Sequence, residues 1–170
     1  MRTALVQRAE RCVRLNFEIQ TIDSQQDFAR RITKCGGSPP WPRGGRALAE
    51  NPLGRASYDR LLRQGTEIRL VNDPTMRDLG VYEGFRNRVT INLPRHATDE
   101  EIASTVVHEA VHQNRYFRKI PPTTQYEEYL AFRNESLFIN GARPSLNERM
   151  RIWSYVQTLY PNLAQGRHPF

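Results

Sequence analysis

The sequence predicts an α+β fold, in which a small mixed or antiparallel sheet packs on one central helix and further helices follow. Three observations predict this fold. Short segments with apolar residues at alternate positions fall between residues 67 and 93. A long amphipathic segment with a helix-capping signal begins at Thr98. Two more capped helical segments come after it.

The 170 residues are expected to form a single domain, 1–170, with a core over 46–170 and an N-terminal segment over 1–45. Within the N-terminal segment, the alternation over 13–19 indicates a strand. A short helix is expected over 24–33.

The end of the N-terminal segment, residues 35–45, contains four glycines and three prolines, which disfavour regular structure. We interpret it as a linker or surface loop. Cys12 and Cys35 form no metal-binding motif at their spacing. They either close a loop in an oxidising compartment or remain two free thiols.

Four short elements are expected before the central helix. Residues 57–64 have the pattern of a short helix, and 67–71 that of a strand. A second strand is expected over 79–85. Residues 88–93 alternate strictly between apolar and polar side chains, which predicts a third strand with one buried face.

The central helix is predicted to begin at a capping box, with Thr98 as the N-cap and Glu101 as the residue that bonds back to it. Apolar residues then recur with helical spacing as far as Phe117. The result is a helix with one broad apolar face.

This helix carries a motif of two histidines with a glutamate between them. His108 and His112 are four residues apart, so they project from one side of the helix about one turn apart. We expect them on the flank of the apolar face. Two imidazoles so placed can share a metal ion, and Glu109 is then placed to take a proton from a metal-activated water.

A second capping box, Thr124 with Glu127, predicts a helix that runs back alongside the first. This helix carries Glu128 and Glu135, which are seven residues apart and so share a face. The small Ala131 between them would let the two helices approach closely.

A third capping box, Ser145 with Glu148, predicts the last helix, which reaches Tyr160. Its apolar residues have amphipathic spacing, so Trp153 and Val156 are expected in the core.

Together, the two histidines and the glutamates of the following helix resemble the zincin metallopeptidases. The closest likeness is to the gluzincin branch, whose third zinc ligand is a glutamate on the next helix. The resemblance covers about residues 67–138. It implies Zn²⁺ as the cofactor. The implied ligands are His108, His112 and Glu128, with Glu135 and then Glu127 as alternatives to Glu128.

The resemblance also implies hydrolysis of peptide bonds in a protein substrate, with Glu109 as the general base. The oxyanion of such a reaction needs a hydrogen-bond donor besides zinc. Five side chains are chemically suitable, and the sequence does not rank them: Tyr126, Tyr129, Tyr155, Arg133 and His168.

In zincins the strand just before the active-site helix is a sheet edge, along which the substrate lies as an added strand. The resemblance therefore implies that residues 88–93 bind an extended peptide through their backbone. The residues expected to bind substrate are Arg88, Val89, Thr90, Ile91 and Asn92. An ordinary core strand would show the same pattern.

The net charge of +7 comes from scattered arginines, with no basic run interleaved with aromatic residues. A nucleic-acid partner is therefore not favoured. The alternative to an enzyme is a basic nucleic-acid- or protein-binding module with an incidental or structural metal site.

The sequence has no apolar run of membrane-spanning length, and its N-terminus lacks the apolar core of a signal peptide. We expect a cytoplasmic protein or one secreted without such a signal. The domain also resembles secreted bacterial effector and toxin domains that carry this motif. That analogy implies a protein target in another cell and, for a toxin, an inhibitory or immunity partner.

Overall fold

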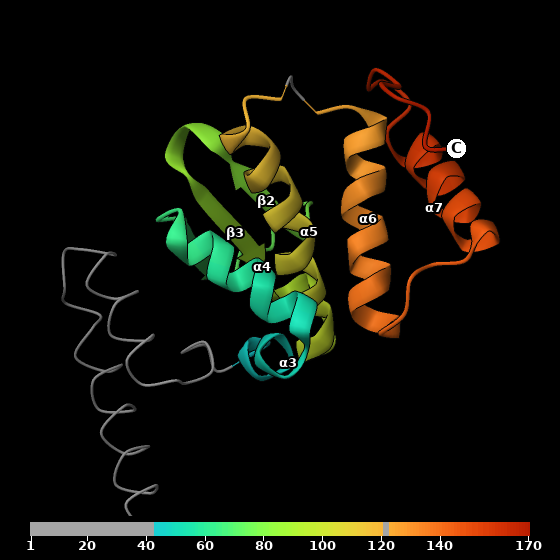
Figure 1. Ribbon diagram of the computed structural model, residues 1–170. Helices are drawn as coiled ribbons and strands as arrows, with labels where there is room; N and C mark the ends of the chain where they lie inside the picture. Colours follow the sequence, from blue (N-terminus) through green and yellow to red (C-terminus); the bar gives the residue numbers. More distant parts are fainter. Residues whose placement is uncertain (1–42, 121–122) are drawn as a thin grey trace, which may run out of the picture.

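A computed structural model describes residues 43–120 and 123–170 of the chain. Within them the fold is α+β, as predicted, with a three-stranded mixed sheet packed on one helix and further helices after it (Figure 1). The expectations for 13–19, 24–33, the two cysteines and most of the loop 35–45 lie outside the described residues.

The elements are labelled as in Figure 1. In chain order they are α3 (Gly45–Glu50), α4 (Pro52–Arg63), β1 (Glu67–Val71), β2 (Gly80–Glu83), β3 (Arg88–Asn92), α5 (Asp99–Phe117), α6 (Gln125–Asn140) and α7 (Leu146–Leu159). Short 3-10 turns, Gly84–Arg86 and Leu93–Arg95, follow β2 and β3. The predicted strands and helices of this part of the chain are confirmed, with shifted ends.

Helix α4 begins earlier than predicted, at Pro52 rather than at residue 57. Asn51 is its N-cap, since the Asn51 Oδ1 accepts hydrogen bonds from the N–H groups of Leu53 (2.9 Å) and Gly54 (3.2 Å). Proline fits the first helical position because its missing N–H would have no partner there. The Asn51 amide also donates to the carbonyl of Phe138 (3.0 Å), which ties α4 to α6.

The sheet has the order β1-β3-β2, with β3 parallel to β1 and antiparallel to β2. Asn87 forms the turn between β2 and β3 with a φ of 47°, a left-handed conformation that asparagine tolerates better than most residues. Its side chain accepts a hydrogen bond from the Thr66 hydroxyl (2.9 Å) and donates one to the Gln64 carbonyl (2.9 Å). The hairpin is thereby fixed to the end of α4.

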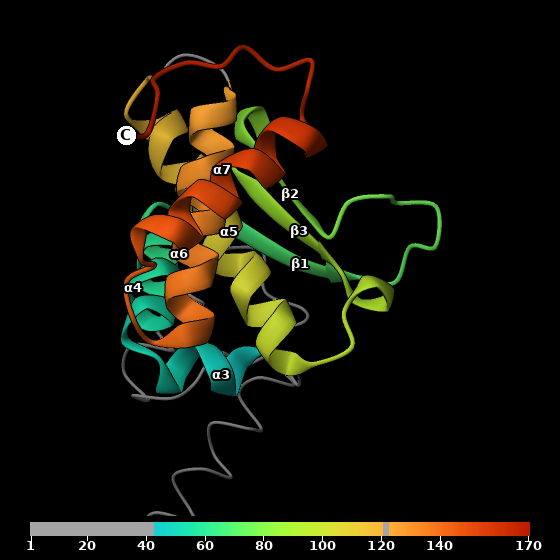
Figure 2. The same cartoon turned by 90° about the vertical axis from the view of Figure 1, so that its right-hand side faces the viewer.

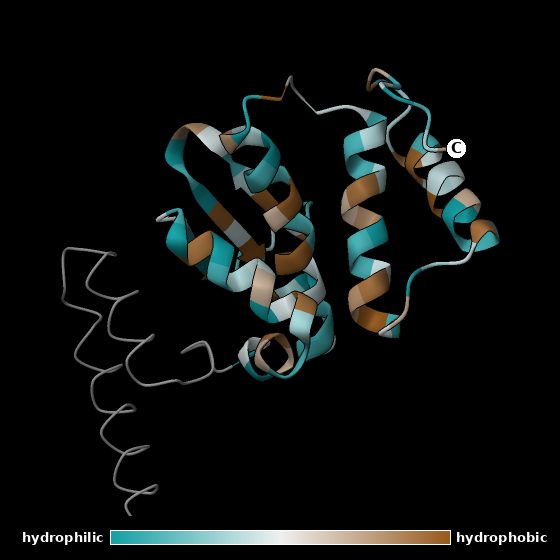
Figure 3. Ribbon diagram, in the orientation of Figure 1, coloured by the Kyte–Doolittle hydropathy of each residue, from teal (hydrophilic) through white to brown (hydrophobic). Residues whose placement is uncertain are grey.

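Helix α5 lies at the centre of the described fold. It packs against β2 and β3, against α4 and against α6, while α7 packs on α6 (Figure 2). Apolar stretches of α5 and of the strands lie inside the fold (Figure 3). None of the helices in the described residues is long and apolar enough to cross a membrane.

The buried apolar residues form two clusters. The larger one joins α3, α4, the sheet and α5, and reaches Phe138 of α6. The smaller one lies between α6 and α7 and consists of Tyr129, Trp153 and Val156 with partly buried neighbours. The prediction that Trp153 and Val156 belong to the core is confirmed. Helix α6 therefore has apolar partners on two sides.

Candidate metal centre

The frame of the site is α5, which begins as predicted. The Thr98 hydroxyl accepts a hydrogen bond from the Glu101 N–H (3.1 Å), and the Glu101 carboxylate accepts one from the Thr98 N–H (3.3 Å). One turn apart on this helix, the rings of His108 and His112 have centroids 5.1 Å apart. The capping box thus fixes the start of the helix that carries both rings.

The two histidines are more enclosed than expected. We expected them on the flank of an amphipathic helix, yet every residue of α5 from 102 to 111 is buried. The reason is that α6 covers that flank. His108 is only 8% exposed and His112 is half-buried, so the flank that carries them is not a solvated surface.

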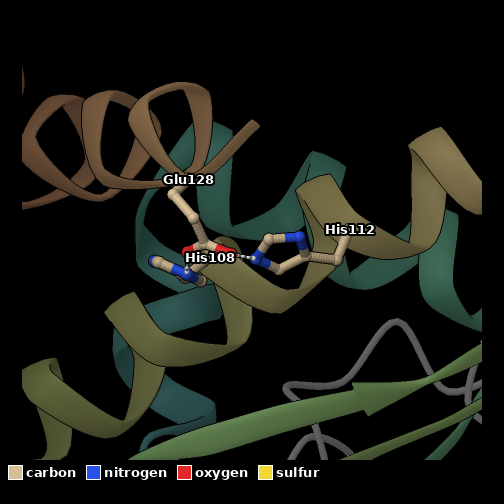
Figure 4. Close-up of side chains that lie close together, drawn as sticks. All are labelled: His108, His112 and Glu128. Atoms are coloured by element: carbon tan, nitrogen blue, oxygen red, sulfur yellow. Dashed lines mark ion pairs between the residues drawn. The ribbon is translucent and has the colours of Figure 1, made fainter. Parts of the chain in front are cut away.

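Glu128 reaches from α6 to both rings, as Figure 4 shows. Its Oε2 lies 3.5 Å from Nε2 of His108, and its Oε1 lies 3.6 Å from Nε2 of His112. The three groups each offer one ligand atom, and these atoms all lie within 4.8 Å of one another. The structure thus brings together a His₂Glu group that can hold a metal ion.

The other two glutamates considered as ligands lie on the far nitrogens of the rings. Glu135 Oε2 is 3.2 Å from Nδ1 of His108, and Glu127 Oε1 is 2.9 Å from Nδ1 of His112. Because an ionised carboxylate only accepts, each Nδ1 carries the hydrogen and donates it. In its neutral form each ring then has its lone pair on Nε2, which faces Glu128.

The two outer carboxylates are themselves held in place. The Ser104 hydroxyl donates to Glu135 (3.2 Å), and Nε of Arg115 lies 2.9 Å from Glu127. The prediction of a full capping box at Thr124 is therefore wrong. The Thr124 hydroxyl does accept from the Glu127 N–H (3.2 Å), but the Glu127 carboxylate turns to the histidine and the arginine instead.

The arrangement fits a metal such as zinc. Two ligand atoms at about 2.0–2.1 Å from one tetrahedral ion lie about 3.3 Å apart, close to the nitrogen–oxygen distances found here. In zinc sites, ligating histidines commonly donate their second N–H to a carboxylate, which fixes the ring and its tautomer.

The electrostatics also favour a cation. Burial alone would lower the pKa of His108, but hydrogen bonds to Glu128 and Glu135 outweigh burial and raise the pKa to about 10. Burial would raise the pKa of Glu127, but hydrogen bonds from His112 and Arg115 hold that pKa below its usual range. Three carboxylates, those of Glu127, Glu128 and Glu135, lie at the ring nitrogens, and Arg115 is the arginine paired with one of them. This excess of negative charge stabilises a cation bound between the rings.

Glu109 points from α5 toward β2. It is 5% exposed, and burial raises the pKa of its carboxyl, although the charges of His108 and His112 and a hydrogen bond from the Tyr82 backbone N–H oppose the rise. A Cβ at Gly80 would lie 2.7 Å from Thr105 and 3.2 Å from Glu109 Oε1. The close approach of β2 to the carboxylate therefore requires glycine at this position.

A cleft of about 610 Å³ opens over these groups. Its walls are β2 with the turn after it, the α5 face that bears the motif, the start of α6, and Tyr160. His108, Glu109, His112 and Glu128 all line it. The candidate metal site is therefore open to a ligand on one side.

The strand next to the cleft at the free edge of the sheet is β2, and not residues 88–93 as expected. β3 is the central strand, paired on both sides, so the prediction that residues 88–93 form an edge is wrong. The alternation fitted a core strand equally well, and Val89, Ile91 and Asn92 are buried. The edge beside the cleft is β2.

The backbone of β2 offers free groups to the cleft. Leu79 accepts a hydrogen bond from the Asn92 N–H (2.9 Å). Because bonded and non-bonded pairs alternate in an antiparallel ladder, Gly80 and Tyr82 direct their N–H and C=O groups away from β3. The contact of the Tyr82 N–H with Glu109 agrees with this direction.

A tyrosine that was not among the five candidate oxyanion donors lies in the wall of the cleft. Tyr160 lines the cleft, whereas the five candidates from the sequence do not. Tyr126 and Tyr129 stack on each other, Tyr155 packs on Phe132, His168 packs on Trp153, and Arg133 lines another cavity. Burial, and then the charges of Glu128 and Glu109, raise the pKa of Tyr160, so its hydroxyl stays protonated.

Comparisons with family models, with curated proteins and with solved structures find no match to this chain.

Proposed function

We propose that this chain is a zinc-dependent peptidase whose chemistry lies in the core 46–170 of a single domain, 1–170. One observation carries the proposal. His108 and His112 both turn Nε2 toward Glu128, while a separate carboxylate holds each Nδ1. An incidental pair of histidines has no reason to be held by a separate carboxylate at each outer nitrogen while both inner nitrogens face one shared carboxylate.

In this proposal His108, His112 and Glu128 hold the ion, and Glu135 and Glu127 orient the two rings. A bound zinc ion supplies a Lewis acid that polarises a carbonyl group and makes a water molecule more acidic. The cleft leaves room beside the three ligands for both.

Glu109 is proposed as the general base. Its buried carboxyl has a raised pKa, which suits a group that takes a proton from the attacking water and then gives it to the leaving amine. The Tyr82 N–H holds the carboxylate toward the cleft.

The substrate is proposed to be an extended peptide that adds to the sheet at β2. Gly80 supplies a backbone donor and acceptor and Tyr82 supplies its carbonyl, and such pairing requires little sequence preference. Tyr160, which lines the cleft, is proposed to donate its hydroxyl hydrogen to the oxyanion. A role as secreted effector or toxin, with an inhibitory partner, stays a prediction.

The test is hydrolysis of a mixture of unstructured peptides by zinc-loaded protein, followed by mass spectrometry. We expect cleavage that a chelator abolishes and that added zinc restores. Glu109→Gln should bind zinc as the wild type does and should lose cleavage by about 10²-fold or more. Glu100→Gln, on an exposed residue of the same helix, is the matched control and should cleave normally.

Cleavage that persists in the chelator, or full activity of Glu109→Gln, would contradict the proposal. Zinc bound at one per chain with no cleavage of any peptide would leave a metal site but remove the peptidase function.

A further inference from the structure

A second cavity, of about 570 Å³, lies away from the candidate metal centre. Its walls come from the second half of α6, the connection to α7 and the first turns of α7, and it shares no lining residue with the cleft. Arg133 is five residues after Glu128 on α6, which places the two side chains on opposite sides of the helix. The cavity is therefore a separate feature.

Three arginines line this cavity: Arg133, Arg143 and Arg149. The rest of the lining is Asn134, Leu137 and Pro144, so it includes no carboxylate. Several other arginines pair with glutamates; Arg88 and Arg115 are examples. Among residues 43–120 and 123–170, no carboxylate lies within ion-pair distance of the three arginines.

Arg149 gives a second sign of a missing partner. Its Nε is shielded from solvent and has no hydrogen-bond acceptor among the described residues. The guanidinium lies 5.9 Å from the ring centre of Phe170, which holds it in place without accepting a hydrogen bond. A shielded N–H without an acceptor is unfavourable, and three clustered cations repel one another. A bound anion would remove both costs.

The chemistry of the lining selects the kind of anion. The planar guanidinium group matches two oxygens of a phosphoryl group with paired hydrogen bonds. Three such groups around a cavity of this size suit a ligand with more than one phosphoryl group. The lining offers no aromatic ring for a nucleobase to stack on.

We propose that Arg133, Arg143 and Arg149 form a binding site for a compact ligand with two or more phosphoryl groups. The source is a free phosphorylated small molecule or the headgroup of a phosphorylated lipid. The site contributes no group to the metal centre, so binding does not require zinc or peptidase activity.

The test is isothermal titration calorimetry of the whole chain with tripolyphosphate, in phosphate-free buffer at about 0.15 M salt. We expect one site per chain. The double variant Arg133→Gln with Arg143→Gln should bind about 10²-fold more weakly, since each charge-assisted bond contributes about tenfold. The control is Arg55→Gln with Arg151→Gln, two exposed arginines outside the cavity, which removes the same charge and should bind within about twofold of wild type.

Vesicles of phosphatidylcholine, with and without phosphatidylinositol bisphosphate, distinguish the lipid from the free ligand. Binding to the phosphorylated vesicles that is lost in the cavity variant but kept in the control supports a lipid source. The proposal would be overturned if both double variants weakened binding equally, or if the chain bound none of the phosphorylated probes. It would also be overturned if the chain bound a single-stranded RNA more tightly and both double variants weakened that binding alike. Arg143 is exposed, so Arg143→Gln alone provides a folded variant if the double variant unfolds.

Discussion

At the scale of single residues, each imidazole of the candidate centre uses one nitrogen to hold its position and directs the other inward. Glu135 fixes His108 and Glu127 fixes His112, so neither ring is free to rotate. Phe132 adds an edge-on contact to His108, with ring centres 4.7 Å apart. Because both rings are already fixed, metal binding does not have to offset the loss of side-chain conformational entropy that ordering them would cause.

The three glutamates of α6 should therefore differ in their effect on zinc. Glu128→Ala removes a proposed ligand and should reduce zinc to well below one per chain after dialysis. Glu135→Gln leaves all three ligands and should weaken zinc binding by about 10–100-fold only, the usual range for an outer partner. Competition with a chromophoric chelator measures both.

Glu100→Gln is the control for charge and should bind zinc like the wild type. If Glu128→Ala still holds one tightly bound zinc, the third ligand is Glu135 or Glu127 instead. In that case, zinc binding by the two double variants that combine Glu128→Ala with Glu135→Ala or with Glu127→Ala identifies the third ligand.

Tyr160 gives a second prediction at this scale. Tyr160→Phe keeps the ring in the wall of the cleft and removes only the hydroxyl hydrogen. We expect kcat to fall by about 10²-fold with KM nearly unchanged, because the hydrogen bond forms to the oxyanion rather than to the bound substrate. Zinc content should not change. Tyr155→Phe, on an exposed tyrosine that packs on Phe132, is the matched control. A loss in KM alone would contradict the assignment.

At the scale of elements, α5 supplies the two rings and the proposed base, and α6 supplies the three carboxylates that contact the ring nitrogens directly. The segment after α7 holds the start of α6, since the N–H groups of Gln125 and Tyr126 donate to the carbonyls of Ala164 (2.9 Å) and Gln165 (3.1 Å). These bonds satisfy first-turn N–H groups that have no partner inside the helix. The position of Glu128 therefore depends on the far end of the chain.

What the sequence could predict was local. The spacing of His108 and His112 on one helix, and two of the three capping boxes, follow from contacts within a few residues. The order of strands and the position of Tyr160 depend on how distant elements pack, and no local pattern encodes them. Strict alternation in β3 indicated one buried face but could not say whether its backbone was paired on one side or on both.

The turn between β2 and β3 offers a test of stability. Asn87→Ala removes the hydrogen bonds to Thr66 and Gln64 and leaves a residue with a Cβ at a φ of 47°. Asn87→Gly loses the same bonds but adopts that φ without strain. We expect both to destabilise the fold, and alanine to cost about 1 kcal/mol more than glycine.

Urea unfolding followed by circular dichroism measures the difference. Equal stability of the two variants would mean that the left-handed conformation adds no strain, and wild-type stability of both would mean that the side-chain bonds add nothing.

At the scale of the whole molecule, the charge is divided unevenly. The chain carries a net charge of +7, yet Glu109, Glu127, Glu128 and Glu135 converge on two histidines in the candidate centre. Without a bound cation, the positive charge next to these carboxylates in the described part of the chain comes from protonated His108 and from Arg115. Because α5 packs on the sheet and on both α4 and α6, a cation bound there would stabilise the whole fold.

Zinc should therefore raise the thermal unfolding temperature. At a free zinc concentration about a hundredfold above Kd, binding to the folded state adds about 2.7 kcal/mol, which corresponds to a rise of about 5–10 °C in a chain of this size. His112→Ala should abolish most of the rise. Ser154→Ala, on an exposed residue of α7, should keep it.

A rise of the same size in His112→Ala would place the stabilising ion elsewhere, since that variant lacks one of the two rings. Absence of any rise in the wild type, with zinc in excess, would mean that the three groups do not bind the ion tightly enough to hold α5 and α6 together.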